Sequence, residues 1–529
     1  MNKSYTKNMK QYETLDGWEK KNFSQQLAHW AEIYGNKTAI VSAETKITYQ
    51  ELDQMVTKTA GRLFHIGIKE ADNVILQLPN RSSFVIYLFA LSRIGAVPVM
   101  ALPAHREAEL GGIIELAQPA AYIVADKYLG FSYEAMAMKL KEKYACLKQI
   151  IIDGETDISK EEGKVKESEF PSIDPYSIAL LLLSGGTTGV PKLIPRTHAD
   201  YLYDARKAAE KCRLNKDTVF LAVLPVPHNF SLGNPGILGT LMGGGTVVMA
   251  PSTSPDEVFP LIEKYGVTVM ALVPSLVSLY LEILEWDDSY DISSLQAVWV
   301  GGSVFEESLA RRVEPEFGCK LQQVFGTAEG LNCFTDLDDP CDVIYTTQGK
   351  AISEADEIRI VDEQGRDVLP GSYGELLARG PYTIDGYYRR PDANQECFTE
   401  DGFYKTGDRA MLTQEGNLKV AGRIVEQINR AGEKIMPGEI ESLLSKAEDI
   451  AESVVVGVPD EQLGNRICAF ILTKNDKHVT YQEVVGFLRA SGVAQYKLPD
   501  QVEIVTVWPL TSVGKIDKRA LIGTVKGME

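Results

Sequence analysis

Several features that define other classes of protein are missing from this chain of 529 residues. Its seven cysteines are scattered without a C-x-x-C pair, and its six histidines are equally dispersed. We therefore expect reduced thiols, as in a cytosolic protein, and neither a disulfide framework nor a zinc site. No Ser/Pro-rich linker, low-complexity segment or internal repeat interrupts the sequence. The composition is that of a globular protein.

Long uninterrupted apolar runs are also missing. The N-terminal residues "MNKSYTKNMKQYETLDGWEKK" contain no apolar segment, so no secretory signal is expected. The most hydrophobic stretch, "FVIYLFALSRIGAVPVMALPA", is interrupted by Arg93, Gly95, Pro98 and Pro103. It predicts a buried helix followed by a buried strand rather than a membrane span. We expect a cytoplasmic enzyme without a membrane partner.

Positive charge is in short supply. The chain has 54 Lys and Arg against 73 Asp and Glu, which gives a net charge of -19. This balance argues against a nucleic-acid or anionic-membrane partner. It leaves local binding of an anion, such as a nucleotide, open.

The order of patterns along the chain predicts an α/β protein with more than one domain, as the length also requires. From about residue 24 to 250, amphipathic helices alternate with short apolar strands, as in βαβ units. We expect a large N-terminal domain of two α/β layers. After about residue 340, Gly and Pro turns between strands predict a β-rich subdomain, and a small α+β domain follows.

Residues 184–192, "SGGTTGVPK", combine three glycines, two threonines and a lysine directly after the apolar run "IALLLL". Glycine lets the backbone approach an anion, while the threonine hydroxyls and Lys192 add donors and a cation. The spacing differs from a P-loop, because Leu193 follows Lys192 where a P-loop has Ser or Thr. The alternative is a Gly-rich turn without a ligand. The restrictive T-T-G-x-P-K core favours a phosphate-binding loop.

Four further motifs follow: "FGTAEG" at 325–330, "YKTGD" at 404–408, "GRIVEQINRAGEKI" at 422–435 and "PLTSVGKIDK" at 509–518. Together with the loop, they resemble in identity and order the motifs of the adenylate-forming superfamily. The resemblance implies ATP as co-substrate, Mg²⁺ as cofactor, and conversion of a carboxylic acid to an acyl-AMP with release of pyrophosphate. Both reactants are anions, so positioning and charge neutralisation dominate such catalysis.

The resemblance assigns roles to individual residues. Glu329 is the expected Mg²⁺ ligand, and Lys515 is expected to reach the carboxylate and the α-phosphate, with Lys192 as a further catalytic cation. Asp408 is expected to accept hydrogen bonds from the ribose hydroxyls, supported by Arg423. The residues expected to contact ATP or AMP are Gly186, Thr187, Thr188, Gly189, Gly302, Gly326, Asp408 and Arg423.

The same resemblance divides the chain into an N-terminal adenylation domain (1–422), a hinge (423–428) and a mobile C-terminal domain (429–529) that carries Lys515. In the superfamily the small domain alternates between an adenylation orientation and one that opens a thiol channel, where Lys434 is expected. The pivot residue is commonly Asp or Lys, and here it is Val425. A valine can absorb the φ/ψ change of a hinge, although its β-branching stiffens it.

Four segments narrow the resemblance to the stand-alone aryl-acid ligases of siderophore pathways, the 2,3-dihydroxybenzoate–AMP and salicylate–AMP ligases. These segments are "LIPRTHADY", "HNFSLGNPG", "RGPYTIDGYY" and "QINRAGEK". The resemblance implies an aryl pocket in which Asn229 binds the ortho hydroxyl and His228 and Phe230 form walls. A core histidine is the alternative for His228. The aryl pocket is expected to consist of His228, Asn229, Phe230, Asn234 and Asn332.

Three pocket positions depart from the family pattern. Dihydroxybenzoate ligases usually have Tyr at Phe230, Ser at Asn234 and Val at Asn332. A buried carboxamide without partners costs about 1–3 kcal/mol. Either the two asparagines satisfy each other or the ligand carries extra polar atoms. The first substrate hypothesis is 2,3-dihydroxybenzoate, and salicylate or another aryl or heteroaryl acid is the alternative.

The acceptor of the acyl group is expected to be the phosphopantetheine thiol of a separate carrier protein, because about a dozen residues follow Lys515. Coenzyme A is the alternative acceptor, as in an aryl- or acyl-CoA ligase. A third hypothesis is a non-catalytic nucleotide-binding or scaffold protein. The presence of Lys192, Glu329, Asp408 and Lys515 argues against it.

Overall fold

The computed structural model describes residues 9–43, 45–154, 169–184, 192–287, 289–303, 305, 307–424, 428–435, 437–474, 477–509, 516 and 518–526. The chain forms two compact units. The larger contains Met1–Pro103, Ala117–Leu183 and Leu193–Gly422, and the smaller contains Ala104–Leu116, Ser184–Lys192 and Arg423–Glu529.

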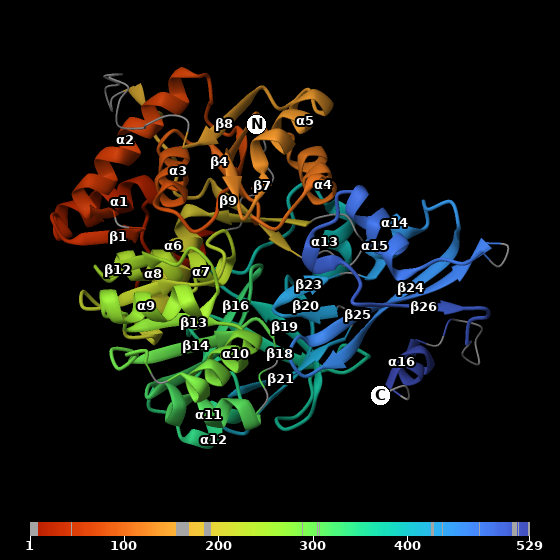
Figure 1. Ribbon diagram of the computed structural model, residues 1–529. Helices are drawn as coiled ribbons and strands as arrows, with labels where there is room; N and C mark the ends of the chain where they lie inside the picture. The colour runs from red at the N-terminus through yellow and green to blue at the C-terminus, as the bar shows by residue number, and fades with distance from the viewer. Residues whose placement is uncertain are drawn as a thin grey trace. The chain divides into compact units, whose positions relative to one another are not determined.

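A nine-stranded mixed sheet runs through the larger unit, in the order β17-β16-β15-β14-β13-β11-β12-β1-β2 (Figure 1). The six strands from β15 to β1 in this order pair in parallel, and β16, β17 and β2 are antiparallel additions at the two ends. The strands are β1 (Thr38–Ser42), β2 (Thr45–Thr48), β11 (Val219–Ala222), β12 (Thr246–Met249), β13 (Val269–Leu272), β14 (Ala297–Gly301), β15 (Lys320–Thr327), β16 (Gly330–Phe334) and β17 (Lys350–Ala351).

A second, six-stranded sheet has the order β10-β9-β4-β3-β5-β8. Parallel pairing joins β9, β4, β3, β5 and β8. The strands are β3 (Asn73–Gln77), β4 (Val97–Met100), β5 (Ala121–Ala125), β8 (Gln149–Asp153), β9 (Ile178–Ser184) and β10 (Lys192–Thr197). A short ribbon, β6 (Lys127–Tyr128) with β7 (Phe131–Ser132), stands apart from both sheets.

Strand alternation separates the two cores of the larger unit. On β14, Ala297 and Trp299 belong to the core shared by both sheets, whereas Val298 and Val300 belong to the core on the other face. Such strands are buried on both faces, as expected for parallel sheets covered by helices. The helices of the shared core are α1 (Phe23–Tyr34), α2 (Tyr49–His65), α3 (Ser82–Arg93), α6 (His198–Lys211) and α8 (Gly236–Met242). Those of the other core are α9 (Pro255–Tyr265), α10 (Pro274–Trp286), α11 (Glu307–Phe317) and α12 (Cys341–Thr346). The predicted pair of α/β layers is confirmed.

Local signals in the sequence explain where elements begin. Thr48 caps α2 and forms the predicted capping box with Glu51. The most hydrophobic stretch of the sequence forms α3, whose residues from Phe84 onward are buried, and then the fully buried β4. None of the described helices combines the length and apolar character needed to cross a membrane.

The predicted β-rich subdomain is a four-stranded sheet in the order β18-β19-β20-β21. Its strands are β18 (Glu357–Val361), β19 (Gly374–Arg379), β20 (Tyr404–Leu412) and β21 (Leu418–Arg423). Leu331 and Cys333 of β16 share its core, so this sheet packs directly against the edge of the nine-stranded one. The remaining helices of the larger unit are α5 (Tyr133–Lys143), α7 (Asn229–Leu232) and α13 (Pro391–Cys397).

The smaller unit is α+β, as predicted. A three-stranded sheet in the order β24-β25-β26 packs with α14 and α15 around a core that includes Val455, Ile467 and Val484. Its elements are β22 (Ile428–Arg430), β23 (Glu433–Ile435), α14 (Pro437–Leu444), β24 (Ile450–Asp460), β25 (Gly464–Thr473), α15 (Tyr481–Ala490), β26 (Gln501–Val505) and α16 (Lys518–Lys526). Most of α4 (Glu107–Ala117) also falls in this unit.

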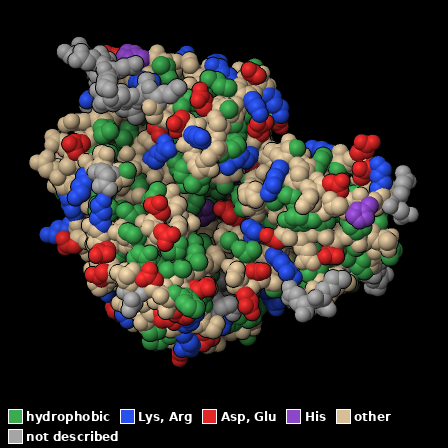
Figure 2. Space-filling view, in the orientation of Figure 1, with side chains coloured by type: hydrophobic (Ala, Val, Ile, Leu, Met, Phe, Trp, Pro, Cys, Tyr) green, Lys and Arg blue, Asp and Glu red, His purple; other side chains and the backbone are tan. Residues whose placement is uncertain are grey.

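Acidic and basic side chains are interspersed on the face shown in Figure 2. Among the coloured side chains of that view, neither sign forms a continuous patch.

Candidate active site

The predicted site residues of the larger unit follow the carboxyl ends of neighbouring parallel strands. Gly302 follows β14, Glu329 follows β15, and His228 with Asn229 follow β11. The carboxyl ends of parallel strands meet at one edge of a sheet, which is where α/β proteins bind ligands. The topology thus brings together residues that are up to about a hundred positions apart in the sequence.

Glu329 lies in the tight connection between β15 and β16 and is 5% exposed. The Tyr387 hydroxyl donates to its Oε1 atom at 2.8 Å, and the Ile384 N–H donates to its backbone carbonyl at 2.8 Å. Burial, together with the nearby Glu329 carboxylate, raises the pKa of Tyr387 well above its ordinary value. Tyr387 is therefore a permanently neutral donor that holds the Glu329 carboxylate in place.

The Thr-Gly-Asp motif is a local bend in β20 that fixes Asp408. Gly407 has a φ of 71°, in the left-handed region that favours glycine. The Asp408 N–H donates to the Thr406 hydroxyl oxygen at 3.0 Å, and that hydroxyl donates to the Leu376 carbonyl of β19 at 3.0 Å. Asp408 is 5% exposed. The bend is held by the Asp408 N–H and the Thr406 hydroxyl, so the buried Asp408 carboxylate is not used to form it.

Glycine is required at two further predicted positions. Gly302 has a φ of 91°, directly after β14. Gly326 pairs with Asn332 across β15 and β16, and a Cβ atom at 326 would lie 2.3 Å from Asn332 Oδ1. Any side chain at position 326 would therefore displace the carboxamide of Asn332.

The predicted aryl pocket is built around the short helix α7. His228 is exposed and caps this helix, with its Nδ1 atom accepting from the Phe230 N–H at 3.3 Å. Asn229 accepts a hydrogen bond from the Tyr201 hydroxyl of α6 at 2.7 Å. Phe230 is 8% exposed and belongs to the core between the two sheets. The pocket segment is thus anchored to α6 and to that core.

Asp204, which the sequence interpretation did not single out, connects the two unusual asparagines. Asn332 Nδ2 donates to Asp204 Oδ1 at 2.9 Å. With the Asn234 amide assigned from its hydrogen-bond pattern, its nitrogen lies 2.7 Å from the same oxygen, and Asn234 and Asn332 are 3.2 Å apart. The asparagines therefore satisfy each other in part, through a shared carboxylate.

Asp204 belongs to a buried ion-pair cluster between Arg196 at the end of β10 and two aspartates of α6. Arg196 Nη2 lies 3.0 Å from Asp204 Oδ2, and Arg196 Nε lies 2.8 Å from Asp200 Oδ1. Arg196 Nη1 also donates to the carbonyl of Ala328, next to Glu329, at 3.2 Å. Burial raises the pKa of Asp204 to about 6, against the lowering effect of Arg196. In the sequence, Arg196, Asp200 and Asp204 are spaced four residues apart. Such a pattern is more often a solvent-exposed helix face, so it did not predict a buried cluster.

His198, the first residue of α6, is buried and accepts a hydrogen bond from the Phe23 N–H at 3.3 Å through Nδ1. Burial lowers the pKa of His198 to about 3. These contacts are those of a neutral core histidine.

Several predicted residues lie at the margins of the described chain. Lys192 begins β10 and is buried, Arg423 ends β21, and Lys434 lies on β23 opposite Asn429. Outside the described residues lie Gly186, Thr187, Thr188, Gly189, Lys515 and the pivot Val425. Their roles stay predictions.

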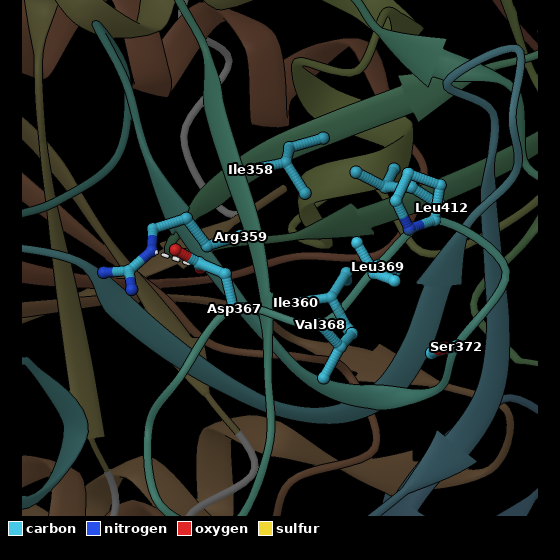
Figure 3. Close-up of a pocket in the computed structure, with 9 residues that line it drawn as sticks. Ile358, Arg359, Ile360, Asp367, Val368, Leu369, Ser372 and Leu412 are labelled. Carbon is cyan, nitrogen blue, oxygen red and sulfur yellow. Dashed lines mark hydrogen bonds and ion pairs between the residues drawn. The ribbon is translucent and has the colours of Figure 1, made fainter.

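A pocket of about 290 Å³ lies on the four-stranded sheet, between β18 and the turn that precedes β19 (Figure 3). Its lining is largely apolar, with Ile358, Ile360 and Leu412 beside an ion pair between Arg359 Nε and Asp367 Oδ1 at 2.7 Å. It shares no residue with the predicted site, so we assign it no part in catalysis.

The AMP-binding enzyme family matches residues 27–388, and the AMP-binding enzyme C-terminal domain matches residues 439–515. The chain therefore belongs to the AMP-binding enzymes, which confirms the resemblance to the adenylate-forming superfamily.

Individual relatives cover nearly the whole chain. The 2,3-dihydroxybenzoate-AMP ligase of Bacillus subtilis is 46% identical over 506 residues, covering 95% of this chain and 94% of its own length. The salicyl-AMP ligase / salicyl-S-ArCP synthetase of Mycobacterium tuberculosis is 42% identical and covers 97% and 92%. The apo structure of Mycobacterium smegmatis MbtA is 38% identical, with a TM-score of 0.75 and 98% coverage of both chains.

Proposed function

We propose that the protein is an acid–AMP ligase that activates a hydroxylated aryl carboxylic acid with ATP. It then transfers the acyl group to the phosphopantetheine thiol of a separate carrier protein, in siderophore or other non-ribosomal peptide synthesis. The first candidate substrate is 2,3-dihydroxybenzoate, and salicylate is the second, in line with the names of the relatives.

One observation carries the proposal. The segment after β11, with Asn229 and Asn234, and the segment after β15, with Glu329 and Asn332, meet at one edge of the sheet through the contacts of Asn332 and Asn234 with Asp204. A candidate aryl pocket is therefore next to a buried carboxylate suited to nucleotide chemistry.

Glu329 fits the Mg²⁺ ion that this family uses. Its carboxylate offers hard oxygen ligands, and in the described part of the chain its side chain meets a neutral tyrosine and forms no ion pair with a lysine or arginine. No cation of the described chain therefore competes with a metal ion for this carboxylate. A bound Mg²⁺ would neutralise charge on the phosphates of ATP.

In the proposed reaction, a carboxylate oxygen of the aryl acid forms a bond to the α-phosphorus of ATP while the bond to pyrophosphate breaks. Asp408 holds the ribose, and Lys192 and Lys515 compensate the charge that develops on the phosphate oxygens. In the second step the thiol loses its proton, its sulfur bonds to the acyl carbon, and AMP leaves.

ATP–pyrophosphate exchange over a panel of benzoic, salicylic, 2,3-dihydroxybenzoic and picolinic acids, with an aliphatic acid as control, tests the activation step. We expect exchange with a hydroxylated aryl acid. Exchange with the aliphatic acid and with no aryl acid would contradict the proposal.

The acceptor and Lys515 need separate assays. We expect the thioester to form on an aryl carrier protein, and a thioester formed only on coenzyme A would make the enzyme an aryl-CoA ligase instead. Lys515→Ala should abolish exchange while ATP binding persists. Unaffected exchange in this variant would refute the role of Lys515.

A further inference from the structure

Asp204 and three asparagines form one connected hydrogen-bond network in the larger unit. Asp204 Oδ1 faces the amide nitrogens of Asn332 at 2.9 Å and of Asn234 at 2.7 Å. In this orientation Asn234 Oδ1 accepts from Asn229 Nδ2 at 2.7 Å. All four side chains are at most 8% exposed. Asp204 is thus linked to Asn229, the residue predicted to bind the ring.

An ionised carboxylate can only accept hydrogen bonds, and this fixes the direction of every amide around it. Asp204 Oδ2 is held by Arg196 at 3.0 Å, so the carboxylate is anchored and Oδ1 is left for the asparagines. Both amide nitrogens therefore turn toward Asp204, and both amide oxygens turn away from it. Arg196 also pairs with Asp200, so the cluster contains two carboxylates for one guanidinium and is rich in acceptors.

By this arrangement, the amide oxygen of Asn332 is left without a donor in the described part of the chain. Among the described residues, no group donates to Asn332 Oδ1, although the side chain is only 1% exposed. The oxygen lies over Gly326, as the 2.3 Å approach to a Cβ built there shows. Val324 and Phe334, two residues along each strand, face the core that contains Phe230. Asn332 Oδ1 is therefore on the face of the sheet that carries α7 and the predicted aryl pocket.

We infer that Asp204 is a positioning residue that turns the amide oxygen of Asn332 toward the ring and so selects hydroxy- or amino-substituted aryl acids. A ring O–H or N–H satisfies the buried acceptor, whereas a substituent of similar size that cannot donate leaves it unsatisfied. This inference rests on the proposed function, because it concerns the acid that the same site activates.

The test compares each hydroxylated acid with its fluoro counterpart, such as salicylic with 2-fluorobenzoic acid, in ATP–pyrophosphate exchange. For the unmodified enzyme we expect kcat/KM to favour the hydroxylated acid by at least about 100-fold. Asp204→Asn keeps the shape but adds a donor, so the amides are free to reverse. In this variant the preference should fall below about 10-fold, mainly through KM of the aryl acid, with KM of ATP unchanged.

Asp200→Asn is the matched control, because it removes the same charge from the same arginine without touching an asparagine. It should keep the substrate preference of the unmodified enzyme. Asn332→Leu, which replaces the amide with an apolar group of similar branched shape, is the second variant in case Asp204→Asn fails to fold. It should lose the preference as Asp204→Asn does.

Failure of the proposed function and failure of the role of Asp204 give different results in these assays. If the unmodified enzyme activates no aryl acid, the proposed function fails. If it activates hydroxylated acids and both Asp204→Asn and Asn332→Leu keep the full preference over the fluoro acids, only the role of Asp204 is refuted. Equal loss in Asp204→Asn and Asp200→Asn would also refute it, because the effect would then be one of charge alone.

Discussion

Two buried carboxylates, Glu329 and Asp204, lie in the same unit and are held in opposite ways. Glu329 meets one neutral hydroxyl, from Tyr387, and no described cation pairs with it. Asp204 is saturated by Arg196 on one oxygen and by two amides on the other. A carboxylate that meets only a neutral donor still has an oxygen available for a ligand, whereas one with partners on both oxygens orients its neighbours. Burial alone therefore does not distinguish a carboxylate that binds a ligand from one that positions its neighbours.

The largest effect on stability is expected for a change at Arg196. Arg196→Met leaves Asp200 and Asp204 buried without their common cation, which should destabilise the fold by about 3–5 kcal/mol. Chemical denaturation of the variant and of the unmodified protein measures this loss. A stability within 1 kcal/mol, on the order of a surface change, would mean that the cluster is not buried in solution.

The next largest effect is expected at Glu329. Glu329→Gln keeps the contact with Tyr387 but removes the charge, so exchange with the best aryl acid should fall by roughly 10²–10³-fold. The melting temperature should stay close to that of the unmodified protein. Full exchange activity in this variant would exclude Glu329 as the Mg²⁺ ligand.

A pH series tests whether the pKa of Asp204 is raised in the folded protein. Its pKa is raised to about 6 in the folded protein by burial, against an ordinary value near 4 in the unfolded chain. The folded state then binds the extra proton between these values, so this group's contribution to stability falls as pH rises from about 4 to 6, by at most about 1.4 kcal/mol per pH unit.

The measurement is the free energy of unfolding of the unmodified protein minus that of Asp204→Asn across this range. The difference should decrease with rising pH. A difference that increases would show that the pKa of Asp204 is lowered rather than raised.

The smallest effect is expected at Tyr387. Tyr387→Phe removes one hydrogen bond from a neutral hydroxyl to the Glu329 carboxylate, worth about 1.5 kcal/mol, so exchange should fall by about tenfold. The dependence of the rate on Mg²⁺ concentration should shift to higher concentrations. A loss as large as that of Glu329→Gln would mean that Tyr387 acts directly in the reaction.

Much of the architecture could be predicted from the sequence, because its signals are local. The capping box at Thr48, the buried helix and strand around Arg93 and the hairpins after residue 400 all depend on neighbouring residues. The reaction class followed from ordered motifs, and family membership confirms it.

The remaining features depend on contacts between distant segments. Asp204 and Asn332 are 128 residues apart, and Glu329 and Tyr387 are 58 apart. The charges of α6 resemble a solvated helix face in the sequence, and only packing between the two sheets buries them. The sequence therefore indicated that Asn234 and Asn332 need hydrogen-bond partners, but it did not identify Asp204 as the carboxylate that joins them.

Detection of the adenylate itself is the direct test of the proposed activity. The purified enzyme would be incubated with ATP, Mg²⁺ and an equimolar mixture of aryl and aliphatic acids, and the products analysed by mass spectrometry. We predict a hydroxylated aryl–AMP, together with an equal amount of pyrophosphate. An aliphatic acyl-AMP alone, or bound ATP with no adenylate from any acid, would show that the protein is not an aryl-acid–AMP ligase.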